Sequence, residues 1–251
     1  MPSSSGPVLH VTPGRHETFL WKRMPGIVPV RKPSFCPCSA RIYDDHHIRR
    51  YTAAMDRQPS RKELTHERIV ETAARAIRRA GFQGVGVADI MREAGLTHGG
   101  FYAHFDSRDA LLVEALEHAG RDSAARIAKA TAPRRSRGAS PLRALVESYL
   151  SEAHLRAVDE GCPVAALASE MPHQAPQVRE AAAQRVHAFI ALVQQALPAT
   201  ALKGSAEAVA SQMVGALQLA RALGDNAQGK ALLSRTRQAL LAQFDATAAS
   251  G

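Results

Sequence analysis

The sequence predicts an all-α protein with a three-helix helix-turn-helix domain near the N-terminus and a larger helical domain after it. From Ser60 onward the composition is rich in Ala, Leu, Arg and Glu, and apolar residues recur with the helical period. Proline and glycine fall mainly between these periodic segments. No run alternates with period two for long, which argues against a sheet. The apolar content of 45% is enough to build a buried core.

The first 57 residues differ from the rest of the chain. They contain seven of the fourteen prolines and show neither the helical nor the strand period. We therefore predict that residues 1–57 are a disordered leader, and we favour a true start at Met55, just before the periodic sequence. This leader carries +5 of the formal net charge of +9. The alternative is that it is translated and acts as a basic arm that binds polyanions non-specifically.

Residues 58–107 are predicted to form the helix-turn-helix domain. Its helices are expected at about 62–80, 87–94 and 97–104. Gly81 is placed to end the first helix, because glycine tolerates a positive φ. The turn Gly95-Leu96 between the two short helices is typical of a helix-turn-helix. Thr97 is expected to cap the last helix with its side chain.

Residues 108–251 are predicted to form the larger domain. Its first helix begins after the capping candidates Asp106 and Ser107 and fades near Pro133, so that the basic stretch 134–138 forms a loop. Further helices are expected at about 141–157, 162–171, 176–196, 205–223 and 226–244.

Composition and motifs exclude several classes of protein. The longest uncharged window, 186–202, is too short and too polar to span a bilayer, and the N-terminus does not read as a secretory signal. We therefore expect a cytoplasmic protein with no membrane partner. The three cysteines do not suit a disulfide framework, and Cys36 and Cys38 with the nearby histidines do not match a standard zinc site. Catalytic motifs are not recognisable, so we expect neither an enzyme nor a bound metal or cofactor.

The segment from Glu67 to Leu112 carries a family resemblance. It reads ERIVETAARAIRRAGFQGVGVADIMREAGLTHGGFYAHFDSRDALL. The first helix ends in AA and then GF, a supporting helix and turn read DI and then AGLT, and GGFYAHF is followed by SRDALL. In these features the segment resembles the N-terminal domain of TetR/AcrR-type transcriptional regulators. The resemblance implies that the helix at 97–104 is a recognition helix for the major groove of double-stranded DNA.

Phosphate contacts are expected from donors on and beside this recognition helix. The residues are Thr97, Tyr102, His104 and Arg108. The resemblance implies that Tyr102 and Arg108 contact the DNA backbone. One family feature is missing, because Gly86 stands where many members have Ser or Thr, and it offers no hydroxyl to a phosphate.

Base contacts are expected from His98, Gly99 and Ala103. Gly99 and Gly100 also allow the backbone to approach a groove or a phosphate closely, because glycine has no side chain. Each of these glycines lowers helix stability by about 1 kcal/mol relative to alanine. Packing by Phe101 and Phe105 is therefore expected to hold the segment in place.

The C-terminal 120 or so residues resemble the regulatory domain of the same family more loosely. The recognisable pieces are GCPVAALASEM at 161–171 and VGALQLARALGD at 214–225. The resemblance implies a helical domain that binds a small-molecule effector and forms a homodimer through its last two helices. It also implies a repressor that the effector releases from a palindromic operator. Our candidates for effector contacts are Tyr149, His154, Cys162, Glu170 and Phe189.

Two other functions stay open. Cys162 lies at the expected N-terminus of a helix, whose dipole lowers a thiol pKa, so the protein could be a redox- or electrophile-sensing repressor. The alternative for Cys162 is a small buried hydrophobe. A non-specific, nucleoid-type DNA-binding protein would use the positive charge of the whole chain. Residues 58–130 carry only +1 of that charge, so the charge says little about the DNA-reading segment.

Overall fold

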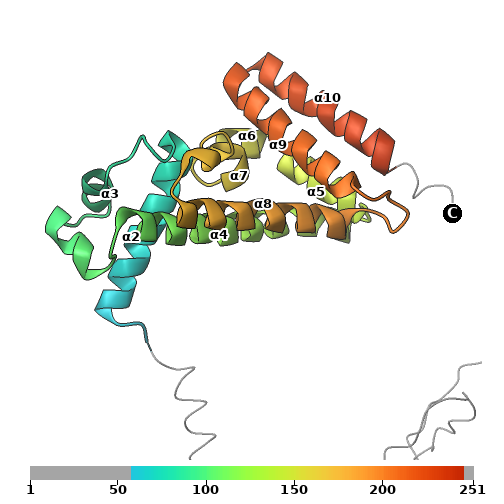
Figure 1. Cartoon of the computed structure of the whole chain (residues 1–251). Helices are drawn as coiled ribbons and strands as arrows, with labels where there is room; N and C mark the ends of the chain where they lie inside the picture. The colour runs from blue at the N-terminus through green and yellow to red at the C-terminus, as the bar shows by residue number, and fades with distance from the viewer. Residues whose placement is uncertain (1–57, 246–251) are drawn as a thin grey trace, which may run out of the picture. The chain divides into compact units, whose positions relative to one another are not determined.

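A computed structural model describes residues 58–245, and every regular element in that range is helical. In chain order these elements are α2 (Arg61–Ala80), α3 (Val87–Glu93), η1 (His98–Ala103), α4 (Arg108–Ser136), α5 (Pro141–Tyr149), α6 (Glu152–Arg156), α7 (Pro163–Leu167), η2 (Met171–His173), α8 (Pro176–Ala196), α9 (Ser205–Leu223) and α10 (Ala227–Phe244) (Figure 1). The predicted all-α class is confirmed. The predictions for the leader, Met55, Cys36 and Cys38 lie outside the described residues.

Helix α2 begins and ends on the signals that the sequence contains. Ser60 and Glu63 form a capping box, in which the Ser60 hydroxyl accepts from the Glu63 amide at 3.2 Å and the Glu63 carboxylate accepts from the Ser60 amide at 2.6 Å. The helix ends at Gly81, whose φ of 77° confirms the prediction for this glycine. Ile69 and Ile77 are fully buried on its inner face.

Helix α4, with 29 residues, is the longest described helix, and it ends later than predicted. It continues through Pro133 to Ser136, so the prediction of a loop at 134–136 is wrong. Side chains add hydrogen bonds near this end: Arg134 donates to the Ala130 carbonyl at 2.9 Å, and Arg137 donates to the Pro133 carbonyl, in the last turn, at 3.0 Å. Arg134 also pairs with Glu147 of α5 at 3.5 Å, a tertiary contact that the local pattern does not reveal.

The segment predicted as one helix at 141–157 is divided into α5 and α6. Ser151 caps a new helix, because its hydroxyl accepts from the His154 amide at 3.2 Å. The His154 ring bonds to the Tyr149 carbonyl at 2.7 Å and so replaces the broken helical bond. The predicted helix at 162–171 is likewise divided, into α7 and the short η2, which has Pro172 in its first turn.

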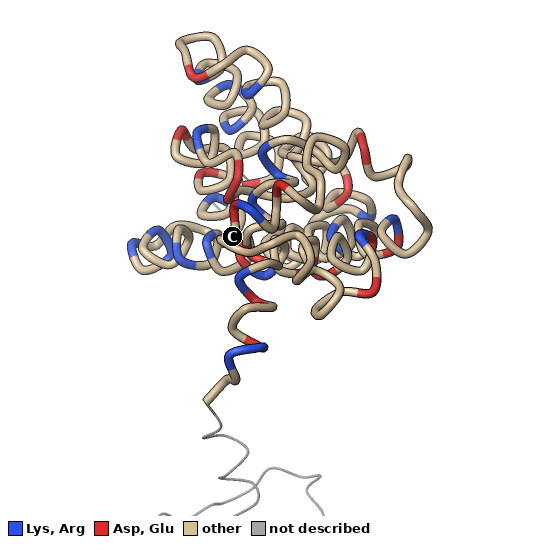
Figure 2. The backbone as a smooth tube through the Cα atoms, turned by 90° about the vertical axis from the view of Figure 1, so that its left-hand side faces the viewer, with Lys and Arg blue, Asp and Glu red and all other residues tan. Residues whose placement is uncertain are grey.

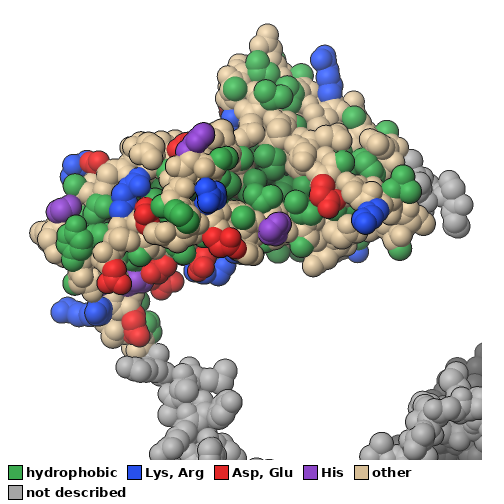
Figure 3. All heavy atoms as spheres, in the orientation of Figure 1, with side chains coloured by type: hydrophobic (Ala, Val, Ile, Leu, Met, Phe, Trp, Pro, Cys, Tyr) green, Lys and Arg blue, Asp and Glu red, His purple; other side chains and the backbone are tan. Residues whose placement is uncertain are grey.

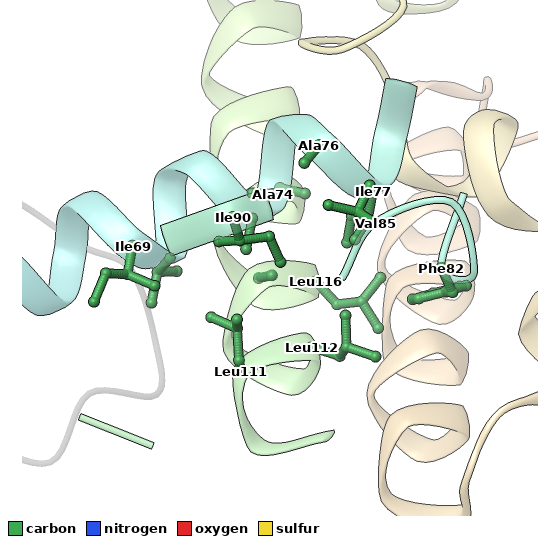
Figure 4. Packing of buried hydrophobic residues seen from close by; sticks show 14 of the residues in the cluster. Ile69, Ala74, Ala76, Ile77, Phe82, Val85, Ile90, Leu111, Leu112 and Leu116 are labelled. Carbon is green, nitrogen blue, oxygen red and sulfur yellow. The ribbon is translucent and has the colours of Figure 1, made fainter. Parts of the chain in front are cut away.

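Two clusters of buried apolar side chains form the core. The first joins α2, α3 and η1 to α4, and it also includes Leu167, Met171 and Val178 from the other half of the chain. Figure 4 shows this packing, with Ile77 of α2 close to Leu112 and Leu116 of α4. The second cluster joins α5, α7, α9, α10 and the C-terminal half of α8. The helix-turn-helix segment is thus packed directly on the helices that follow it.

The helices are arranged so that α8 runs beside α4, while α9 and α10 pair with each other along one side (Figure 1). Helix α9 ends at Gly224, with φ 94°, and Asn226 then caps α10 through bonds from the amides of Gln228 and Gly229. Both helices lie close to their predicted positions. Among the described residues, no helix combines the length and the apolar character that crossing a membrane requires.

Candidate DNA-binding face and effector cavity

The short helix predicted at about 97–104 is present as a 3-10 helix, η1. Two consecutive glycines have low helix propensity, and a short 3-10 turn is a common outcome for such a segment. Phe101 and Phe105 are 1% and 3% exposed, and their rings stack with centroids 5.5 Å apart. Packing by these two rings holds η1 against α3, as predicted.

The outer side of η1 is exposed. The residues Thr97, His98, Gly99, Tyr102 and Ala103 are all exposed, and Tyr102 has 71% of its surface accessible. Thr97 occupies the N-cap position, but its side chain makes no capping bond, so that part of the prediction is wrong. Its hydroxyl is therefore available to an external partner. In Figure 3 the end of the molecule formed by α3 and η1 carries histidine and hydrophobic side chains among a few charges.

The charges around this face are mixed in sign. Figure 2 looks onto the side of the molecule that carries α3 and η1, and it shows Lys and Arg interspersed with Asp and Glu. Several of these pair locally, as Arg79 does with Glu93 at 2.9 Å and Arg92 with Asp89 at 2.5 Å. The face is therefore no uniform basic patch, in agreement with the small net charge of residues 58–130.

His104 and Arg108 are turned toward the molecule itself. His104 is half-buried, its Nδ1 is buried without a hydrogen-bond partner among the described residues, and its ring lies 5.9 Å from that of His66. Burial and the neighbouring His66 lower the pKa of His104, which favours the neutral imidazole. The Arg108 guanidinium donates to the Phe82 carbonyl. Both residues thus have an internal role beside the predicted DNA contact.

Glu170 binds the turn that follows α2. Its carboxylate accepts from the Phe82 amide at 2.9 Å, while the carbonyl of Phe82 accepts from Arg108. A Cβ added at Gly81 would lie 2.2 Å from a Glu170 carboxylate oxygen, so the glycine is needed for this close approach. The turn is thereby held between α4 and the segment before η2.

Two hollows meet at α4 and share Ser123 and Ile127 as lining residues. The first has a volume of about 420 Å³ and lies between α4, α5, α6 and the stretch up to Gly161. The second has a volume of about 380 Å³ and lies between α4, α7 and α8. Both volumes fall in the range of ~300–1,000 Å³ that is usual for small-molecule sites.

Between the hollows and α9 lies a cluster of polar groups that we call the cavity wall, and it is formed by Tyr149, His154, Gly161, Cys162 and Arg221. The His154 ring bonds to the Tyr149 carbonyl through Nδ1 at 2.7 Å and accepts from the Cys162 amide through Nε2 at 3.0 Å. A carbonyl only accepts, so Nδ1 must carry the proton and Nε2 must be free, which defines the neutral tautomer. Burial lowers the pKa of His154 to about 4, in agreement with this pattern. Arg221 of α9 donates to the carbonyls of His154 and Ala157, each at 3.0 Å.

A buried arginine joins this wall to α2. Arg78 is 4% exposed and donates to the Gly161 carbonyl and to the Asp122 carboxylate, both at 3.2 Å. Gly161 lines the first hollow. One side chain thus spans from the helix-turn-helix segment to a residue of the cavity wall.

Comparison with known proteins identifies the family. A model described as bacterial regulatory proteins of the tetR family matches residues 69–115, and one described as a Tetracyclin repressor-like C-terminal domain matches residues 138–240. An HTH-type transcriptional regulator of Mycobacterium tuberculosis is 30% identical over 175 residues, which are 69% of this chain and 86% of the relative. The chain belongs to the TetR family. It is a DNA-binding transcriptional regulator, and members of this family are regulators rather than enzymes.

Solved structures show the same fold. A TetR transcriptional regulator from Chloroflexus aurantiacus aligns with a TM-score of 0.58 at 22% identity, covering 73% of this chain and 96% of the other. The reduced form of Escherichia coli NemR aligns with a TM-score of 0.55 at 21% identity, covering 69% and 95%. A TetR-family regulator from Streptomyces coelicolor aligns with a TM-score of 0.55 at 24% identity, covering 72% and 95%.

The surroundings of Cys162 do not favour the sensor hypothesis for this TetR-family protein. Cys162 is 3% exposed, and burial raises its pKa, with the Tyr149 hydroxyl as the main opposing influence. The predicted net lowering of the pKa is wrong, because desolvation outweighs the opposing hydrogen bonds from the Tyr149 side chain and from the backbone of Val164 and Ala165 in α7. Cys162 therefore matches its alternative description, a small buried hydrophobe.

The other effector candidates fall into two groups. His154, Cys162 and Phe189 line the hollows of the TetR-family fold. Tyr149 is fully buried within the cavity wall, and Glu170 binds the Phe82 turn, so neither is among the lining residues. Burial raises the pKa of Tyr149 well above its usual value, which keeps the phenol neutral.

Sequence reasoning missed three arginines of this site, Arg78, Arg185 and Arg221. Arg78 is a charged residue of an amphipathic helix, and its residue type alone does not indicate that its side chain is buried, as the structure shows it to be. One signal was present, since Arg78 lies four residues after Ala74 of the buried face and donates to the Ala74 carbonyl at 3.0 Å. For Arg185 and Arg221 the decisive neighbours are Gly120 and His154, which are distant in sequence.

Proposed function

We propose that this TetR-family regulator is a homodimeric repressor that leaves a palindromic operator when a small-molecule effector occupies the hollows beside α4. The observation that carries the proposal is the bond from Arg78 of α2 to the Gly161 carbonyl at 3.2 Å. An effector acts only through a difference in affinity between two states. A ligand that displaces the Gly161 segment would strain this bond and shift α2, and with it the helix-turn-helix.

The proposed reading surface is the outer side of η1. Its exposed residues Thr97, His98, Gly99, Tyr102 and Ala103, with Gly100 beneath them, would face the major groove. Tyr102 and Thr97 offer hydroxyls suited to phosphate oxygens. His104 and Arg108 would add backbone contacts, since the guanidinium of Arg108 has further N–H groups besides the one that bonds to Phe82.

The proposed dimer interface lies on α9 and α10, which pair along one side of the molecule (Figure 1). Leu219 and Leu223 of α9 are 59% and 43% exposed, and because they are four residues apart they lie on the same face of the helix. Pairing with the same helices of a second copy would bury them in an isologous four-helix arrangement. The two recognition segments would then reach successive major grooves about 34–36 Å apart.

Footprinting on the DNA upstream of the protein's own gene tests this function, with salt titrated. We expect a protected palindrome and a preference for it over unrelated duplex of about 10³ or more. Equal affinity for any duplex with a steep salt slope would overturn the proposal and favour the nucleoid-type alternative. Sedimentation of the protein alone and with the operator tests the dimer, and a monomer on DNA would contradict it.

A further inference from the structure

We propose that the hollow between α4, α7 and α8 binds an apolar organic anion, a small molecule with one carboxylate that is held by Arg185. The inference rests on the proposed function only in taking this molecule to be the effector. The hollow holds about 380 Å³, enough for a small organic molecule.

The wall of this hollow is mostly apolar. Its larger side chains are Ile127 of α4, Val164 of α7, and Phe189 and Leu192 of α8. Ala124, Ala188 and Ala191 at its rim are exposed, so the hollow is open to solvent and a ligand can enter without the fold opening. The body of the ligand is therefore apolar, because polar groups placed against this wall would lose their hydrogen bonds to water.

Arg185 supplies a positive charge that no carboxylate of the wall balances. It is half-buried, its Nε is buried without a hydrogen-bond partner, and it takes part in no ion pair among the described residues. The described residues that line this hollow include neither Asp nor Glu. In the first hollow, by contrast, Arg126 pairs with Glu160 at 2.6 Å and with Asp122 at 3.3 Å, and its second cation, Lys129, is exposed to solvent. The unbalanced charge of the second hollow therefore favours an anion.

Gly120 of α4 makes room for this guanidinium. A Cβ added at Gly120 would lie 2.6 Å from Nη1 of Arg185 and 2.7 Å from its Cδ. Glycine in the interior of a helix is unfavourable, so its presence at this contact is explained by the close approach of Arg185. The planar guanidinium of Arg185 is thereby held against α4. A carboxylate matches such a guanidinium because it can accept two parallel hydrogen bonds from it.

The position of the hollow links this ligand to the helix-turn-helix. Cys162 and Pro163 line it, and they directly follow Gly161, whose carbonyl accepts from Arg78 at 3.2 Å. A ligand lodged against α7 therefore presses on the segment that holds α2.

Calorimetry on the full chain without DNA tests the charge preference with matched probes. At pH 7.5 we compare octanoate with 1-octanol and octylamine, and 2-naphthoate with 2-naphthol. We expect each acid to bind about tenfold or more tightly than the alcohol with the same body, and octylamine to bind more weakly than either. Comparing the octyl chain with the naphthalene ring shows whether the hollow prefers a linear or a flat ligand. Equal binding of acid and alcohol in both pairs would overturn the inference.

Variants locate the charge. Arg185→Gln is expected to remove the preference for the acid, while Arg179→Gln, an exposed arginine on the same helix, keeps it. Gly120→Ala retains the charge but displaces the guanidinium, and it is expected to lower acid affinity although alanine favours the helix. Retention of the preference in folded Arg185→Gln, or its loss in Lys129→Gln of the first hollow, would overturn the assignment.

The same proteins are footprinted on the operator to keep the two proposals apart. If the wild type protects a palindrome but shows no acid preference, the ligand inference fails while the regulator stands. If acids bind through Arg185 but no palindrome is protected, the proposed function fails while the binding site stands.

Discussion

Glycines occur both in the recognition segment η1 and in the cavity wall, but their surroundings differ. A Cβ added at Gly99 would meet no atom within 4 Å, and one at Gly100 would make an ordinary contact with Met91 at 3.7 Å. A Cβ added at Gly161 would lie 2.6 Å from the Ala157 carbonyl oxygen and 2.7 Å from Nε2 of His154. The space beside Gly99 is open to a partner outside the chain, whereas the chain itself fills the space beside Gly161.

The two tyrosines of these regions differ in the same way. Tyr102 on η1 is 71% exposed, and Tyr149 of the cavity wall is fully buried. Apart from the buried Phe101, side chains of the recognition segment are exposed or half-buried and thus contribute little to the packing of the fold, while those of the wall are fixed by burial and hydrogen bonds. Substitutions in the wall should therefore change stability, and substitutions in the recognition segment should change DNA binding alone.

The largest loss of stability is expected from Arg78→Met. The change removes the donor to the Gly161 carbonyl and leaves the Asp122 carboxylate with Arg126 as its remaining partner. Breaking a buried charge pair of this kind should lower the free energy of unfolding by about 3 kcal/mol, measured by urea denaturation. Arg79→Met, the exposed neighbour, is the control and should change it by about 0.5 kcal/mol or less. Equal effects of the two substitutions would contradict the buried role of Arg78.

A comparable effect is expected from pH through His154. Its pKa is about 4 in the folded protein and about 6.5 when unfolded, so the unfolded chain binds the proton more readily. Stability from this group is complete above pH 6.5 and is lost as the pH falls toward 4, by up to about 3 kcal/mol. Urea denaturation of wild type and His154→Gln between pH 7.5 and 4.5 checks this. Parallel curves for the two proteins would show that His154 is not responsible.

Gly161→Ala should cost somewhat less. The added methyl group would collide with the Ala157 carbonyl, and neighbouring groups must shift to accommodate it. We expect a loss of about 2 kcal/mol in the free energy of unfolding, as is usual for overpacking. A change below about 0.5 kcal/mol would mean that the wall adapts without strain, and it would remove the contrast with Gly99.

Gly99→Ala should leave stability unchanged or raise it by up to about 1 kcal/mol, because alanine favours a helix. Operator affinity should nevertheless fall about tenfold or more, since the methyl group would occupy the space offered to DNA. A gel-shift titration measures the affinity at fixed salt. Tyr102→Phe should likewise weaken operator binding, by a smaller factor, through the loss of one phosphate contact. Unchanged affinity in both variants would place the reading surface elsewhere.

Much of the fold could be predicted from local patterns. Helices α2, α3, α8, α9 and α10 lie close to the expected positions, because their apolar periodicity and their caps agree with each other. The prediction of one continuous helix at 141–157 was wrong because Ser151 caps a new helix. The break is stabilised by the bond from the His154 ring to the Tyr149 carbonyl, which the local sequence pattern does not reveal. The predicted end of α4 was also wrong because of a contact that local patterns do not reveal, the ion pair of Arg134 with Glu147 of the next helix.

The sequence by itself determined the all-α class, the helix-turn-helix segment and the exposed residues of its recognition segment, since these depend on periodicity, turn chemistry and a contiguous motif. Only the tertiary structure decided the protonation state of Cys162, the turn-binding role of Glu170 and the burial of Arg78. A pKa and the burial of a charge depend on neighbours that are distant in the chain, such as Asp122 and Gly161 beside Arg78. Spacing along one segment carries no information about those neighbours.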